Sequence, residues 1–251
     1  MITEEHNGQV LILTLDNPAR RNALGMDMRV SLQAALDRAE PDPEVRAVVI
    51  RGAGDHFCAG ADITGMNVTD AAGARERFRI SHKMVRTLVK SSKPVVAAIE
   101  GWCVGAGISL ALCCDTIVAA SDARFMAGFG KVGLMGDLGI LHLLPARVGL
   151  GRAKQMVLYG EAMAAPEAER IGLVDRLAEP GKAFEDALAC AKKLEAMAAL
   201  PIAFTKEFYA RGLDESLDIE RSYQPTLLLS EDHKEGKAAF MEKRAPRFKG
   251  R

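Results

Sequence analysis

The chain has 251 residues, 49% of them hydrophobic, and its 33 basic and 33 acidic residues give a formal net charge of +0. A chain of this length can bury a sizeable core as one globular domain, with or without a helical appendage. The balanced charge argues against a nucleic-acid partner, whose usual footprint is a basic surface. The acidic start "MITEEHNGQV" does not resemble a signal peptide, and no apolar run approaches the ~20 residues of a membrane helix. We therefore expect a cytoplasmic protein with no membrane partner.

In chain order, the first part of the sequence alternates between strands and helices. Continuously apolar stretches predict buried strands over 9–15, 46–52 and 94–101. Apolar residues at helical spacing predict helices over 26–40 and 71–89, and a third helix is expected over 105–114, after a run of glycines. Short strands over 116–121 and 123–128 precede a helix over 138–149, which we expect Pro145 to break. This alternation indicates an α/β fold.

The character of the sequence changes toward the C-terminus. From Pro201 onward only helical periodicity remains, and charged residues are dense. Ser230, followed by two acidic residues, predicts the N-terminus of a last helix, and a basic tail follows that helix. We therefore divide the chain into an α/β core over 1–195 and a helical region over 196–251.

Cysteine and histidine give no pattern of a metal site. The five cysteines form no C-x-x-C repeat and the five histidines no H-x-x-x-H pair, so we expect buried, reduced thiols and no metal. The string "GFGKVG" matches G-x-G-x-x-G, but it lies in the middle of the chain with no acid at the required distance. We interpret this match as chance.

Two segments rich in glycine and alanine each follow a predicted strand. They are "CAGADI" (58–63) and "GWCVGAGISL" (101–110). The second is expected to form the first turn of a helix, where N–H groups are unpaired and the helix dipole favours negative charge. Two such donors that converge from separate strand ends would form an oxyanion hole, and small side chains would let a substrate carbonyl approach the backbone.

Five stretches of the sequence together resemble the crotonase superfamily, the enoyl-CoA hydratase/isomerase family. They are "NPARRNAL", "GAGDHFCAGADI", "KPVVAAIEGWCVGAGISLALCCD", "ARFMAGFGKVGL" and "SEDHKEGKAAFMEKRAPRFKG". The resemblance implies a spiral of ββα units over 1–195 that binds acyl-CoA, and C-terminal helices over 196–251 that mediate trimerisation. It also implies an acyl-CoA thioester substrate, no cofactor beyond the CoA of that substrate, and a homotrimer or a hexamer.

The resemblance further assigns site residues. It implies that the backbone N–H groups of Ala61 and Ala106 form the oxyanion hole. It places a larger set of residues against CoA or substrate: Arg20, Arg21, Ala59, Asp62, Ile63, Thr64, Gly105, Ser109, Phe129, Phe240 and Lys243. Arg20 and Arg21 would reach CoA phosphates or simply be solvated, whereas Phe240 and Lys243 match a C-terminal helix that closes over CoA. The helix over 71–89 is expected to form much of the acyl-pocket wall.

The acidic residues distinguish the reactions of the family. Hydratases of the family carry two catalytic glutamates, and the corresponding positions here hold Ser109 and Phe129. Of the acids between positions 101 and 160, Asp115 has the setting of a structural residue and Asp122 that of a turn residue. Asp137 differs from both, because apolar and glycine residues flank it in the loop expected to face the acyl chain.

Desolvation in such a setting raises the pKa of a carboxyl group and suits it to proton transfer. Family members with an aspartate here include isomerases, and double-bond migration needs only one base. We therefore predict an enoyl-CoA isomerase with Asp137 as acid/base. The alternatives are an Asp137 that caps the following helix, an Asp137 that acts as a nucleophile, a hydratase whose water is held by Ser109 and Asp137, and a non-catalytic CoA-binding homologue.

Overall fold

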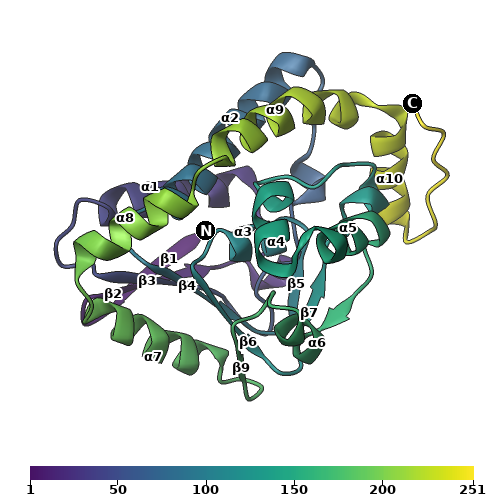
Figure 1. Ribbon diagram of the computed structural model, residues 1–251. Helices are drawn as coiled ribbons and strands as arrows, with labels where there is room; N and C mark the ends of the chain where they lie inside the picture. The colour runs from purple at the N-terminus through teal and green to yellow at the C-terminus, as the bar shows by residue number, and fades with distance from the viewer.

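Six strands form the larger of two β-sheets in the computed structural model, which describes residues 1–251 (Figure 1). In spatial order they are β1 (Ile2–Asn7), β2 (Val10–Leu15), β3 (Ala47–Gly52), β4 (Val95–Ile99), β6 (Thr116–Ala120) and β9 (Arg176–Ala178). Only β1 runs antiparallel to its neighbour. Strands β2 and β4 are buried along their whole length, which is why their sequences are continuously apolar.

The smaller sheet has three strands, in the order β5-β7-β8. They are β5 (Trp102–Val104), β7 (Arg124–Met126) and β8 (Met163–Ala164). Strand β5 begins three residues after the end of β4, so the chain passes directly from the large sheet into the small one. Three 3₁₀ helices lie in the connections: η1 (Pro18–Arg20), η2 (Ile63–Gly65) and η3 (Phe129–Val132).

Ten α-helices surround the sheets. They are α1 (Met26–Ala39), α2 (Ala71–Lys90), α3 (Ala106–Leu112), α4 (Ile140–Val148), α5 (Leu150–Tyr159), α6 (Ala165–Arg170), α7 (Ala183–Glu195), α8 (Ala199–Tyr209), α9 (Leu213–Leu229) and α10 (Glu231–Glu242). Helix α7 packs on one face of the large sheet, whereas α8 and α9 run along α2 on the other side (Figure 1). Helix α10 packs against η3.

The α/β fold with a helical C-terminal part is confirmed, and so is the Ser230 cap, whose hydroxyl accepts the His233 N–H at 3.0 Å. The predicted break at Pro145 is wrong, because α4 begins at Ile140 and continues past the proline to Val148. A proline in this helix removes only one backbone donor, and the flanking turns keep theirs. The boundary at residue 195 falls between α7 and α8, and the oligomerisation role beyond it stays a prediction.

All five cysteines are buried, as expected, and none is in a disulfide. None of the helices combines the length and the apolar composition that crossing a membrane requires. No cluster of three or more His, Cys, Asp or Glu side chains is placed to hold a metal ion.

Candidate active site

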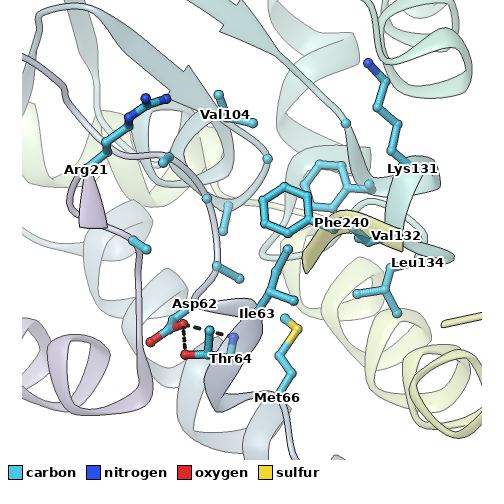
Figure 2. A pocket seen from close by; sticks show the side chains of 18 of the residues that line it. Arg21, Asp62, Ile63, Thr64, Met66, Val104, Lys131, Val132, Leu134 and Phe240 are labelled. Carbon is cyan, nitrogen blue, oxygen red and sulfur yellow. Dashed lines mark hydrogen bonds between the residues drawn. The ribbon is translucent and has the colours of Figure 1, made fainter. Parts of the chain in front are cut away.

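A pocket of about 410 Å³ opens where the loop around η1, the segment around η2, the start of α3, η3 and the end of α10 meet (Figure 2). Most of the residues predicted for the site line it: Arg20, Arg21, Ala59, Ala61, Asp62, Ile63, Thr64, Gly105, Ala106, Phe129, Asp137 and Phe240. They come from segments that are far apart in the sequence. The fold therefore brings the two predicted N–H donors and the predicted carboxyl group to one cavity.

Ala61 and Ala106 both line the pocket, and their N–H groups have no partner within the protein. Ala61 pairs with Leu24 only through a single β-bridge, in which the Leu24 N–H donates to the Gly60 carbonyl at 2.7 Å. Ala106 is the first residue of α3, where helical N–H groups lack an acceptor. The pocket therefore receives two unpaired backbone donors from separate segments.

Two glycines explain how these segments come so close. A Cβ on Gly60 would lie 3.1 Å from the Val104 carbonyl oxygen, and one on Gly107 would lie 2.5 Å from the Cys58 carbonyl oxygen. The segments are also joined by backbone hydrogen bonds, such as Val104 N–H to Cys58 O at 2.9 Å. The small residues thus serve first to pack protein backbone against protein backbone.

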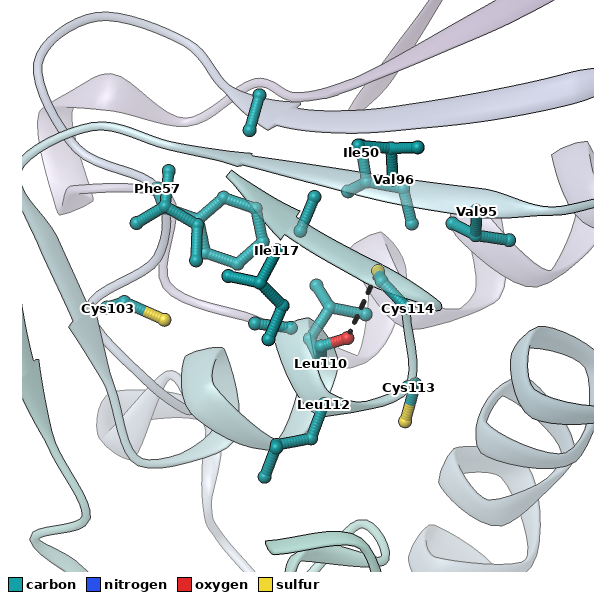
Figure 3. Packing of buried hydrophobic residues seen from close by; sticks show 14 of the residues in the cluster. Ile50, Phe57, Val95, Val96, Cys103, Leu110, Leu112, Cys113, Cys114 and Ile117 are labelled. Carbon is teal, nitrogen blue, oxygen red and sulfur yellow. Dashed lines mark hydrogen bonds between the residues drawn. The ribbon is translucent and has the colours of Figure 1, made fainter. Parts of the chain in front are cut away.

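Helix α3 is anchored in the core. All its residues are buried, and Leu110 packs in the apolar cluster that also contains Ile117 of β6 and Phe57 (Figure 3). Because a well-packed core resists displacement, the first turn of α3 is held in one place. The Ala106 donor is therefore preorganised, which is what an oxyanion hole requires.

Polar side chains at the pocket bond to one another. The Arg20 guanidinium donates to Asp62 Oδ2 at 2.8 Å and to Thr64 Oγ1 at 2.7 Å. Arg21 and Lys131 also line the pocket, form no ion pair, and lie on opposite sides in Figure 2. Lys131 was not found by sequence reasoning, although it lies in the "GFGKVG" match that we interpreted as chance.

Two predicted site residues and the predicted wall helix lie outside this pocket, and their contact with CoA or substrate stays a prediction. Ser109 does not line the pocket: it is fully buried, and its hydroxyl donates to the Asp137 carbonyl at 2.8 Å. Lys243 does not line it either; it is the C-cap of α10, in a left-handed conformation with φ of 55°. No residue of α2 lines it, because Met66 and Leu134 lie between α2 and the cavity, with Phe78 packed behind them.

Asp137 lines the pocket with only 5% of its surface exposed, and its Oδ1 atom has no hydrogen-bond partner. It does not cap the following helix, because Gly139 is the N-cap of α4 and no side-chain cap bond is present. Burial raises the pKa of the Asp137 carboxyl to about 6, and the nearby Arg29 guanidinium opposes the rise. Asp137 is therefore a buried carboxyl group with a free oxygen and a proton affinity near neutral pH.

A buried polar cluster lies close to Asp137, and sequence reasoning missed it. Arg29 is 1% exposed, donates to Ser81 Oγ at 2.7 Å, and has an unpartnered Nη2. His82 Nε2 lies 3.2 Å from Glu220 Oε2, but the two are not aligned as a hydrogen bond. Burial lowers the pKa of His82 to about 4 and raises that of Glu220 to about 7. His82 is thus neutral at pH 7, and the contact is not a full ion pair.

Glu220 falls on the apolar face of its helix. Leu213, Leu217, Glu220, Gln224 and Leu228 follow one another at intervals of three or four residues, and all are buried. A glutamate on the buried stripe of a helix is the sequence signal that indicates Glu220 as a functional candidate, since charged side chains are rarely fully buried unless they are paired.

The fold and this site define an enzyme of the crotonase superfamily. The family model described as "Enoyl-CoA hydratase/isomerase" matches residues 5–251. The 1,2-epoxyphenylacetyl-CoA isomerase of Escherichia coli is 34% identical over 96% of this chain and 95% of that protein. The crotonyl-CoA hydratase of Syntrophomonas wolfei is 33% identical over 97% and 96%. The chain belongs to the enoyl-CoA hydratase/isomerase family.

A solved structure supports the same assignment. The crystal structure of an enoyl-CoA hydratase from Mycobacterium avium subsp. paratuberculosis superimposes with a TM-score of 0.90 at 33% identity. The match covers 99% of this chain and 98% of that one. Relatives named hydratases reach 38% identity, and the relative named an isomerase is 34% identical, so the family membership alone does not fix the reaction.

Proposed function

We propose that the protein moves the double bond of an enoyl-CoA, with Asp137 as acid/base and the Ala61 and Ala106 N–H groups as the oxyanion hole. One observation carries the proposal: a buried carboxyl group with a free oxygen lines the same pocket as both unpaired N–H groups. Asp62 is the only other acid that lines this pocket, and its carboxylate already accepts from Arg20 and Thr64. Asp137 is therefore the acid that is free to react.

The reaction needs one base and one anion site. The Asp137 carboxylate takes a proton from C2 of a 3-enoyl-CoA, and the electrons of that C–H bond move onto the thioester oxygen. The N–H groups of Ala61 and Ala106 stabilise this dienolate oxygen, each by ~3 kcal/mol. Asp137 then returns the proton at C4, the double bond moves from C3–C4 to C2–C3, and no atom is gained or lost.

The pKa of Asp137, about 6, suits both steps. The group is mostly ionised at neutral pH, and its conjugate acid is strong enough to give the proton back. Water addition is less well supported, because the positions of the two family glutamates hold Ser109 and Phe129. Ser109 lies outside the pocket, and the one hydrogen of its hydroxyl is already donated to the Asp137 carbonyl, so it cannot donate to a water beside the substrate.

The proposed substrate is an acyl-CoA thioester, and the only cofactor moiety in the proposal is the CoA of that substrate. Arg21 and Lys131 are unpaired cations at the pocket and are the candidates to meet CoA phosphates. Phe240 is 60% exposed at the pocket, so its ring is available to cover the CoA chain. Its place on α10 agrees with the expected role of that helix.

We further propose that 196–251 mediates a homotrimer or a hexamer. Helices α8 and α9 expose large apolar side chains: Leu200, Phe204, Phe208, Tyr209, Ile219 and Tyr223. Exposed apolar surface of this kind is typical of a protein interface. Light scattering on the purified protein measures the state directly, and a monomer would contradict this proposal. A cytoplasmic location stays a prediction.

The test of the reaction offers the protein a 3-enoyl-CoA and, separately, a 2-enoyl-CoA in D₂O. We expect the double bond to migrate, observed by chromatographic separation of the two isomeric enoyl-CoA esters, with deuterium at C4 only to the extent that the proton on Asp137 exchanges with solvent before it is returned. We expect this activity to disappear in Asp137→Asn. Gain of one water by the 2-enoyl substrate, without migration in the 3-enoyl substrate, would show a hydratase instead.

A further inference from the structure

The turn that carries Asp137 is held at three backbone atoms by buried side chains. The Gln224 amide donates to the Met135 carbonyl at 2.8 Å, and the Ser109 hydroxyl donates to the Asp137 carbonyl at 2.8 Å. The Gly139 N–H donates to the Glu220 carboxylate, at 3.0 Å from Oε1 and 3.3 Å from Oε2. Two of these three side chains belong to α9. Helix α9 thus forms hydrogen bonds to the backbone of the turn on both sides of Asp137.

The backbone of this turn needs such support. Leu138 has φ of 56° and is fully buried, and Gly139 follows with φ of 81°. A left-handed conformation is unfavourable for leucine and persists only where surrounding contacts enforce it. The Glu220 carboxylate binds the N–H group directly after this residue, so it stabilises the conformation that directs Asp137 into the pocket.

Glu220 has no other evident use. It is 1% exposed, does not line the pocket, and accepts hydrogen bonds only from the backbone of this turn. The basic side chain next to it is His82, which is itself 1% exposed and poorly aligned for a hydrogen bond with Glu220. A buried carboxyl group is costly, so its presence here calls for a role that an apolar side chain would not fill.

We propose that Glu220 is a positioning residue for Asp137, which fixes both the place and the proton affinity of the Asp137 carboxyl group. The inference rests on the proposed function of Asp137. Four ionisable groups from three helices face that carboxyl group: Arg29 of α1, Arg77 and His82 of α2, and Glu220 of α9. Burial is the main cause that disfavours the ionised form of Asp137, and among these four groups only Glu220, when ionised, adds to it. Helix α9 would then contribute to the reaction as well as to oligomerisation.

The experiment compares Glu220→Ala and Glu220→Gln with Glu215→Gln, a control at an exposed glutamate of the same helix. Glu220→Ala removes the acceptor for Gly139, and misplacement of Asp137 is expected to lower kcat by ~10–100-fold with little change in KM. Glu220→Gln keeps an acceptor oxygen and should recover most of this loss, to within ~5-fold of the wild type. If Glu220→Ala does not fold, Glu220→Gln alone carries the test through its effect on the titration of Asp137.

The second readout does not need turnover. Carbon-13 labelling of aspartate carboxyl groups gives the titration curve of Asp137, identified by the resonance missing from Asp137→Asn. The pKa of Glu220, about 7, lies above that of Asp137, about 6, so the charge that Glu220 acquires opposes the last part of the Asp137 titration. We expect the upper part of the Asp137 titration to be broadened in wild type and in Glu215→Gln, and to sharpen to a single step in Glu220→Gln. Titration curves of Asp137 with the same shape in wild type and in Glu220→Gln would overturn the inference. Absence of double-bond migration in wild type would instead refute the proposed function, and the titration would still test whether Glu220 acts on Asp137.

Discussion

Ala61 and Ala106 present backbone N–H groups to the pocket, whereas Asp137 presents a side chain that other side chains hold in place. We call the first pair the oxyanion wall and Asp137 with its turn the carboxyl wall. The oxyanion wall is fixed by α3, whose residues are all buried, and by backbone hydrogen bonds between segments. The carboxyl wall depends on Ser109, Glu220 and Gln224, which are replaceable by mutation.

The difference teaches how one fold can support several reactions. A donor made of backbone survives most side-chain substitutions, so an anion site built from such donors tolerates changes in the neighbouring side chains. A carboxyl group held by side chains can be lost, moved or retuned by a few substitutions. This agrees with the finding that relatives named hydratases, at 33–38% identity, and a relative named an isomerase, at 34%, belong to one family with this chain.

The largest loss of activity is expected when the carboxyl group of the carboxyl wall is removed. Asp137→Asn keeps the shape of the side chain but cannot take a proton, so we expect kcat to fall by ~10²–10⁴-fold. CoA affinity, measured by calorimetry, should be unchanged, because Asp137 is not among the residues proposed to contact CoA. Activity within tenfold of wild type would contradict the assigned base.

The oxyanion wall can be broken at a single donor. Proline is well tolerated at the first position of a helix, so Ala106→Pro removes the N–H at the start of α3 while the helix should persist. Loss of one oxyanion donor is expected to lower kcat by ~10²–10³-fold. Ala106→Gly retains the N–H and serves as the control. Equal activity of the two variants at equal melting temperature would exclude this donor.

The two walls should also differ in their response to pH. Backbone N–H groups do not titrate, whereas Asp137 must be ionised to act as a base, and its pKa is about 6. The value of kcat/KM should therefore fall about tenfold per pH unit as the pH drops below this pKa. Ala106→Pro should lower the whole profile without moving its acid limb. A limb that moves in Ala106→Pro would contradict the separation of the walls.

The sequence predicts the residues of both walls but not the side chains that support the carboxyl wall. The segments of Ala61 and Ala106 follow apolar strand runs, and the resemblance of these segments to the family assigns the two N–H donors, because backbone geometry depends on neighbouring residues. Asp137 was found in the same way, from the apolar and glycine residues around it. The strands and most helices were predicted for the same reason, since their periodicity is local.

The buried polar side chains around Asp137 could not be predicted from local sequence. Arg29, His82 and Glu220 lie on three helices that are far apart in the sequence, and only tertiary packing brings them near Asp137. The partner of Ser109 was missed for the same reason: its spacing from Ala106 matches a catalytic position of the family, but the side chain donates to the Asp137 carbonyl. Spacing along a helix gives the face of a residue and not its partner.

Ser109 joins the two walls, because it stands on α3 three residues after Ala106 and bonds to the backbone of Asp137. Ser109→Ala removes one buried hydrogen bond, so we expect kcat to fall by ~3–10-fold, less than in Asp137→Asn or Ala106→Pro. Ser91→Ala is the control, since Ser91 is also buried but bonds to Glu40.

The double variant Ser109→Ala/Glu220→Gln tests whether both side chains position the same turn, the one that carries Asp137. If each positions the same Asp137 turn, the combined loss in kcat should differ from the product of the single losses, as for residues in one network. Independent effects would mean that the two side chains do not act on a common turn. A loss for Ser109→Ala as large as that for Asp137→Asn would mean that Ser109 contacts the substrate after all, and the oxyanion wall would then contribute a side chain to the chemistry.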